Sequence, residues 1–217
     1  HADQSKVGED DQGYQFYVGD LKFKDLNGDG KIDKGDWTLA NPGDYKKIGN
    51  KSNRLPFSID LTADWKGFDV RAFFQGIAKK DWYADGGNHY FWGIYAQPWT
   101  NVQEQNLDHW TPENPNAYFP RIKAYIAEST GSELAAVQTK YLQNAAYMRM
   151  KNFTFGYTLP KSLTQKAGIE RLRFYFSGEN LFEFSGLKAN LDPEALDDDG
   201  KVYPLQRSFS FGFNLNF

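Results

Sequence analysis

The last ten residues, Ser208–Phe217, constrain the fold more than any other stretch of the chain. Apolar side chains occupy every second position, and they are Phe209, Phe211, Phe213, Leu215 and Phe217. Because neighbouring side chains of a strand point to opposite faces, this alternation predicts a strand with one aromatic and one polar face. A strand of this length, tilted by about 45°, spans ~24 Å, close to the ~25 Å apolar band of a transmembrane barrel. The alternative is a strand of a soluble sandwich, since alternation is common in antiparallel sheets.

Composition excludes several other classes of protein. The chain has 217 residues, no cysteine and a net charge of −3, so neither a disulfide framework nor nucleic-acid binding is expected. Its mean hydropathy of −0.69 and the lack of a run of ~18 apolar residues argue against a transmembrane helix. Aromatic residues make up 17% of the chain, which suits strands and the aromatic girdles of membrane barrels.

Four further segments have the same two-faced pattern. They are Phe57–Trp65, Phe68–Gly76, Tyr147–Leu159 and Leu172–Leu181. The turn Lys66-Gly67 predicts a two-residue hairpin in which Trp65 lies opposite Phe68, which places all the apolar residues of both strands on one face. Charged residues on the opposite face would be costly in a dry core but suit a wet lumen. The connections alternate between short (66–67, 160–171, with a helical turn closed by Gly168) and long (20–56, 77–145, 182–206), as in transmembrane barrels.

The segment from Asp25 to Asp36 has the spacing of a calcium-binding loop. Oxygen donors fall at positions 1, 3, 5, 9 and 12, a glycine stands at position 6, and position 7 can offer its carbonyl; the predicted ligands are Asp25, Asn27, Asp29, Lys31, Asp33 and Asp36. The last position departs from the EF-hand pattern, because an aspartate replaces the usual glutamate. The flanks do not read as helices, so a structural Ca²⁺ site is expected; the alternative is a turn that holds no metal.

The long segment 77–145 is expected to carry function, because loops of this length are usually functional. Two short helices are predicted in it, at Val102–Trp110 and at Ser132–Leu142 with Ser132 as the N-cap. It also contains four tryptophans that are candidates for stacking on sugar or contacting a partner: Trp82, Trp92, Trp99 and Trp110. The alternative is that these rings form the small core of the segment itself.

Enzyme activity is not expected. No cysteine nucleophile exists, and His89 and His109 have no serine or aspartate at a recognisable catalytic spacing. A soluble calcium-binding β module for carbohydrate binding or adhesion is the alternative function. That function accounts for the Asp25–Asp36 loop and the tryptophans, but less well for five strands with one apolar and one charged face.

Several motifs, in order along residues 20–217, resemble the SusC/RagA family of TonB-dependent outer-membrane transporters of Bacteroidetes. They are Asp25–Asp33, the Trp65–Asp69 hairpin with Phe73-Phe-Gln-Gly76, Trp110–Ala117, Tyr147–Pro160, Ser177–Phe182, Leu191–Glu194 and the closing phenylalanine strand. The resemblance implies an all-β fold in which this chain is the C-terminal segment, about five strands, of a large antiparallel transmembrane β-barrel, which in the family has 22 strands around a plug. Residues 1–56 would then be an extracellular loop region, and residues 57–217 barrel strands with long extracellular loops.

The same resemblance implies a function and a set of partners. The chain would be part of a nutrient importer for glycans or peptides in the bacterial outer membrane. Its partners would be a SusD-like surface lipoprotein, the remaining barrel and plug of the same protein, and the TonB complex, with transporter and lipoprotein pairs forming dimers.

Overall fold

A computed structural model gives the structure of the chain, and it describes residues 2–5, 7, 16–97, 99–123, 133–188, 191–196, 203 and 205–217. Most of its regular structure is antiparallel strand, with a few short helices. Within these residues, no helix has both the length and the apolar character needed to cross a membrane.

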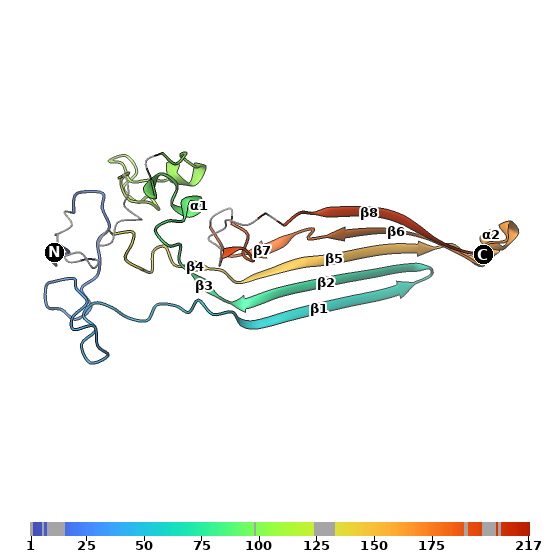
Figure 1. The fold of residues 1–217 in the computed structure, drawn as a ribbon, viewed down its shortest axis with the longest axis horizontal. Helices are drawn as coiled ribbons and strands as arrows, with labels where there is room; N and C mark the ends of the chain where they lie inside the picture. The colour runs from blue at the N-terminus through green and yellow to red at the C-terminus, as the bar shows by residue number, and fades with distance from the viewer. Residues whose placement is uncertain are drawn as a thin grey trace.

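Five long strands form one antiparallel sheet, ordered β1-β2-β5-β6-β8, and a short sixth strand, β7, pairs with β5 (Figure 1). Their bounds are β1 Arg54–Trp65, β2 Phe68–Lys79, β5 Tyr147–Thr158, β6 Arg171–Glu179, β7 Glu183–Ser185 and β8 Ser208–Asn216. The five long strands correspond to the five predicted from alternation. The predicted fold class is therefore confirmed as an antiparallel all-β sheet that fits part of a barrel.

The β1–β2 hairpin has the predicted register. Lys66 and Gly67 both have positive φ, 48° and 89°, which is the backbone of the two-residue turn that matches strand twist. Trp65 therefore pairs with Phe68, and the pairing continues in step to Arg54 and Lys79. One irregularity was not predicted: the β2–β5 pairing shifts by one residue between Phe73 and Phe74.

The two ends of the sheet differ in what they carry (Figure 1). One end holds the β1–β2 turn, the C-terminus and the predicted helical turn, which consists of α2 (Lys161–Thr164) and η3 (Gln165–Ala167). Gly168 closes that turn in the left-handed conformation, as predicted. The other end holds the N-terminal region and most of the segment 77–145, which we call the excursion.

The excursion differs from its predicted secondary structure. In place of a helix over 102–110, only the one-turn η2 (Glu104–Leu107) forms; a capping box of Gln103 and Asn106 marks its start, and it ends at Asp108. Residues 133–142 form turns, so the second helix is absent from its described part, and its expected N-cap, Ser132, lies outside the described residues. Unpredicted elements are α1 (His89–Trp92), η1 (Gly93–Tyr95) and the pair β3 (Asp81–Trp82) with β4 (Gln143–Asn144).

Candidate functional site

The long strands present one apolar and one polar face. On the apolar face, large side chains of all five strands are exposed to solvent, Phe211 by 82% and Trp65 by 67% of their surface. Others on this face that are exposed are Leu61, Phe68, Phe155, Phe174, Phe209 and Phe213. A contiguous exposed patch of this kind marks a surface that contacts a membrane or a partner.

The polar face is crossed by ion pairs. Arg71 on β2 binds Asp60 on β1 through both Nε and Nη2, at 3.0 and 2.6 Å. Arg173 on β6 reaches across β5 to bind Asp69 on β2 in the same forked manner. The intervening position on β5 is Gly156, where a Cβ atom would collide with the guanidinium group of Arg173. The absence of a side chain at this glycine therefore allows the Arg173–Asp69 pair to lie flat on the sheet.

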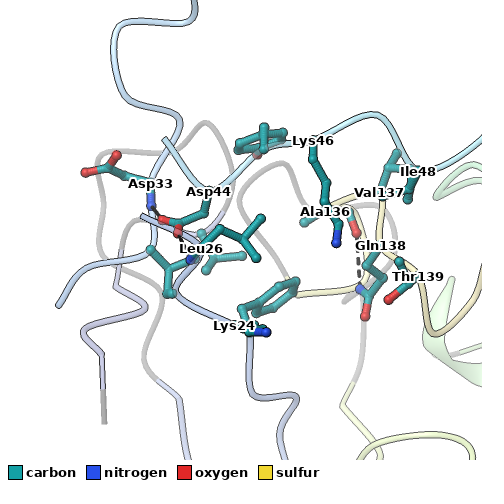
Figure 2. A pocket seen from close by; sticks show the side chains of 14 residues that line it. Lys24, Leu26, Asp33, Asp44, Lys46, Ile48, Ala136, Val137, Gln138 and Thr139 are labelled. Atoms are coloured by element: carbon teal, nitrogen blue, oxygen red, sulfur yellow. Dashed lines mark hydrogen bonds between the residues drawn. The ribbon is translucent and has the colours of Figure 1, made fainter. Parts of the chain in front are cut away.

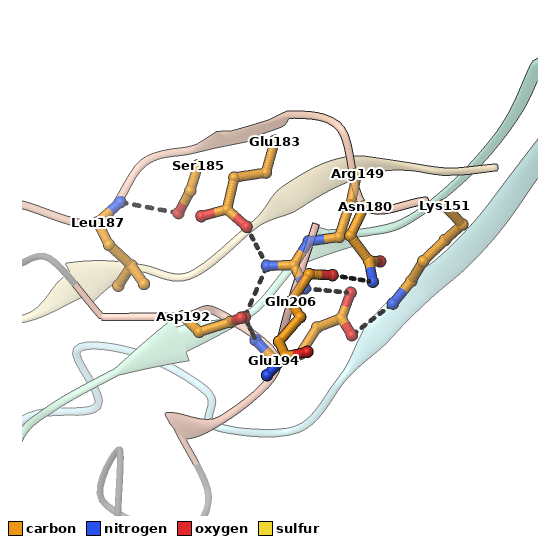
Figure 3. Close-up of polar contacts among 9 residues, drawn as sticks. All are labelled: Arg149, Lys151, Asn180, Glu183, Ser185, Leu187, Asp192, Glu194 and Gln206. Atoms are coloured by element: carbon orange, nitrogen blue, oxygen red, sulfur yellow. Dashed lines mark hydrogen bonds and ion pairs between the residues drawn. The ribbon is translucent and has the colours of Figure 1, made fainter. Parts of the chain in front are cut away.

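Arg149 is the centre of a charged cluster at the excursion end of the polar face (Figure 3). Its guanidinium group binds Glu183 on β7 and Asp192, with Nη2 2.8 Å from Asp192 Oδ1. Glu194 lies 3.5 Å from Nη1 and also accepts a hydrogen bond from Lys151, at 2.6 Å. The Arg149 side chain is only 4% exposed, so its charge is compensated almost entirely by these carboxylates.

Segment 191–196 joins this cluster to the excursion. Asp192 and Glu194 bind the charged side chains of β5, while Leu191 and Leu196 pack in the hydrophobic cluster of the excursion. The segment lies in the loop between β7 and β8, which composition alone identifies only as a polar connection. Its role depends on contacts between residues more than 40 positions apart, which no local pattern reports.

Aromatic rings form the core of the excursion. Trp92, Tyr95, Phe119 and Tyr141 are fully buried and contact one another edge to face or stacked, with Phe119 and Tyr141 5.7 Å apart between ring centroids. Burial raises the pKa of the Tyr95 and Tyr141 hydroxyl groups, and each donates a hydrogen bond to a backbone carbonyl oxygen.

The four candidate tryptophans have different environments. Trp82 and Trp92 belong to the buried cluster, so they supply the core of the excursion rather than an exposed surface. Trp110 is partly buried and packs against Gly19, where a side chain would collide with its ring. Trp99 is the most exposed of the four, with 69% of its surface accessible.

The loop Asp25–Asp36 folds on its own backbone. Asp25 accepts hydrogen bonds from the N–H groups of Gly28 and Gly30, and Asp29 accepts one from Lys31. A residue outside the predicted ligand set, Asp44, accepts from the N–H groups of Leu26 and Asp33. In the described part of the chain, no three histidine or acidic side chains cluster as a metal site requires.

A buried acidic pair lies where the N-terminal region meets the excursion. Asp20 and Glu133 are both almost completely buried, and Lys123 contacts both carboxylates. Glu133 also accepts a hydrogen bond from the N–H group of Leu21, at 2.5 Å. Burial nevertheless raises the pKa of Glu133 to about 7, since the stabilising charges only partly offset its loss of water.

A small pocket lies between residues 23–48 and residues 136–139, and its volume is about 210 Å³ (Figure 2). Its walls are mainly apolar and include Val7, Phe23, Leu26, Ile32, Ile48 and Val137. Lys24 and Lys46 also line it, as do Asp33 and Asp44. This pocket was not predicted, because its two walls are about 90 residues apart in the sequence.

The chain matches no protein-family model. Its curated relatives include TonB-dependent receptors P3 and P26 of Formosa agariphila, each 28% identical, over 90% and 92% of this chain. The TonB-dependent receptor SusC of Bacteroides thetaiotaomicron is 26% identical over 90% of this chain. The matches cover 19%, 20% and 17% of the relatives, so the chain spans about a fifth of their length.

Two solved transporter structures share the fold of this chain. The RagAB peptide transporter superposes with a TM-score of 0.52 at 24% identity, over 73% of this chain and 16% of that chain. The RagAB peptide importer in its "open-open" state gives a TM-score of 0.53 over 75% of this chain. The curated relatives are receptors, and none of the three is named as an enzyme. The resemblance to the SusC/RagA family is therefore confirmed: the homologues of this chain are TonB-dependent receptors, SusC among them.

Proposed function

We propose that this chain forms part of the barrel wall of a TonB-dependent importer that takes up a nutrient across the bacterial outer membrane. The observation that carries the proposal is the two-faced sheet: its apolar face stays exposed over five strands, while ion pairs cross the opposite face. In a membrane barrel the first face contacts lipid and the second lines a hydrated interior. The names of the curated relatives support the same function.

The two ends of the sheet suggest an orientation in the membrane. Barrels have short periplasmic turns and long extracellular loops. The end with Lys66-Gly67 and the short α2 turn would then be periplasmic, and the excursion would lie outside the cell with segment 191–196 and the exposed Trp99. In this position the excursion can contact cargo or a partner.

The importer would work with a SusD-like surface lipoprotein and take its energy from the TonB complex, with dimers of the transporter–lipoprotein pair. The similarity to SusC and to the RagAB structures supports this partnership, and glycan and peptide are the two cargo classes. Affinity purification of the full-length protein from outer membranes tests it. We expect a lipoprotein to co-purify in equal amount; a transporter that is recovered alone under mild detergent would contradict the partnership.

Matched substitutions on β8 test the membrane assignment. Phe211→Lys places a charge on the apolar face, which costs about 2–4 kcal/mol at the middle of a bilayer. Ser210→Lys places the same charge on the polar face, where Ser210 pairs with Ser177. We expect the first variant to be depleted from outer-membrane fractions of the full-length protein, and the second to assemble normally. Equal tolerance of both changes would show that the apolar face does not contact lipid.

A further inference from the structure

We propose that the pocket between residues 23–48 and 136–139 binds a small organic anion, a carboxylate on an apolar body. This inference is independent of transport by the barrel. The segments that line the pocket belong to the N-terminal region and the excursion, and Figure 1 shows these regions beyond one end of the sheet.

The size and walls of the pocket define the body of the ligand. A volume of about 210 Å³ is below the ~300–1,000 Å³ of clefts that take drug-sized molecules, so the ligand is no larger than one ring with a short chain. The apolar side chains in the walls come from both segments, including Phe23 and Ile48 on one side and Val137 on the other. An aromatic ring or a short alkyl chain would be removed from water between them.

The polar groups of the pocket define the charge of the ligand. Both carboxylate oxygens of Asp44 accept backbone hydrogen bonds, from Leu26 at 2.6 Å and from Asp33 at 2.9 Å. Oδ1 of Asp33 likewise accepts from the N–H group of Gly35 at 2.8 Å. Both acids therefore bind the backbone of their own loop, Asp44 through both carboxylate oxygens and Asp33 through one.

The two lysines of the pocket differ from the acids in their contacts. Lys24 and Lys46 are exposed, and none of the ion pairs found among the described residues involves either of them. Figure 2 shows the Lys46 side chain extending from its loop segment toward Ala136 and Gln138. Ammonium groups are strong donors without acceptor capacity, so the hydrogen bonds left for a ligand suit an anion.

The test compares two probes of nearly the same shape and opposite charge, 3-phenylpropanoate and 3-phenylpropan-1-amine. Binding to the full-length protein in lipid nanodiscs is measured by saturation-transfer NMR and calorimetry. We expect the carboxylate to bind at least about tenfold more tightly than the amine, because only the carboxylate can accept a charge-assisted hydrogen bond from a lysine. Equal affinity of the two probes, or binding of neither, would overturn the proposal.

Variants locate the binding. The double change Lys24→Gln and Lys46→Gln is expected to weaken carboxylate binding by about tenfold. The matched control is Lys22→Gln with Lys47→Gln, two exposed lysines that do not line the pocket, and it is expected to bind as the parent does.

Val137→Trp is expected to fill the pocket and abolish binding of either probe, while circular dichroism confirms that the variant is folded. Carboxylate binding that survives Val137→Trp would place the site elsewhere. Because binding is measured on purified protein, loss of import and loss of binding can be told apart.

Discussion

At the scale of single residues, Arg149 has the most consequential contacts on the polar face. Removing one partner of a buried ion pair leaves the other charges uncompensated, which typically costs about 3–5 kcal/mol. Arg149→Met would leave Glu183, Asp192 and Glu194 close together without their shared cation. We therefore expect segment 191–196 to detach from β5, seen as faster amide hydrogen exchange of that segment in the full-length protein.

Lys151→Met is the matched control for Arg149→Met. Among the described residues Lys151 forms an ion pair with Glu194 alone, and its side chain is more exposed than that of Arg149. Pairs of this kind contribute about 0–1 kcal/mol, so hydrogen exchange of segment 191–196 should change little. If both substitutions accelerate exchange equally, the segment depends on general charge balance and not on Arg149.

Glu133 makes the contact between the N-terminal region and the excursion depend on pH. Its pKa rises from 4.5 to about 7 on folding, so between these values the folded state holds a proton that the unfolded state has lost. The contribution of Glu133 to the stability of this contact is therefore highest below pH 4.5 and falls as the pH rises toward 7, by at most about 3 kcal/mol. The groups that surround Glu133 are Asp20, which raises this pKa further, and Lys123 and Arg121, which lower it.

Hydrogen exchange of the Leu21 amide measures this effect, since Leu21 donates to Glu133. After correction for the intrinsic pH dependence of exchange, we expect protection in the full-length protein to decrease between pH 5 and pH 8. Glu133→Gln keeps an acceptor for Leu21 and removes the titration, so its protection should be constant over this range. A parent protein with constant protection would show that Glu133 does not titrate there.

At the scale of secondary-structure elements, the strands were predictable and the excursion was not. Period-two alternation and the Lys66-Gly67 turn are local signals, and together they determine the register from Trp65–Phe68 onward. The excursion has no such signal, since its rings meet across long separations, as Phe91 does with Phe119 and Trp92 with Tyr141. Over 102–110 the structure has only the single turn Glu104–Leu107, so the local helix propensity of this segment did not determine its conformation.

The candidate site was likewise predictable only where the sequence carries a local signal. Sequence alone located the two faces of the sheet, and it kept open whether the tryptophans form a core, as Trp82 and Trp92 do. It missed the Arg149 cluster and the pocket, because each is built from segments that are adjacent only in the folded chain. The alternation pattern assigns an arginine in a strand to the polar face, but it does not indicate what the side chain binds.

The calcium loop remains a prediction of its spacing. Its acidic groups bind backbone N–H groups here, with Gly28 and Gly30 at positive φ. If the loop takes Ca²⁺, calorimetry on the full-length protein will show one site that is lost in Asp29→Ala and retained in Asp64→Ala, an aspartate on the sheet. If Ca²⁺ causes no heat change and no shift in thermal unfolding, the segment is a metal-free turn.

At the scale of the whole molecule, the sheet has two open edges, β1 and β8, with 12 and 9 residues. Each edge presents backbone donors and acceptors that would pair with neighbouring strands in a closed barrel. The apolar face adds a second surface that water disfavours, with Phe211 and Trp65 among its most exposed side chains. Residues 1–217 alone therefore lack both the strand partners and the lipid that would satisfy these surfaces.

Refolding of the isolated 217-residue chain separates these two effects. In buffer without detergent we expect aggregation, measured by light scattering, because face and edges are both exposed. Detergent covers the apolar face but cannot supply backbone hydrogen bonds to β1 and β8, so we expect soluble sheets that associate edge to edge as dimers or larger oligomers. A folded monomer in plain buffer would instead favour a self-contained soluble β module, and a detergent-solubilised monomer would show that the edges are not adhesive.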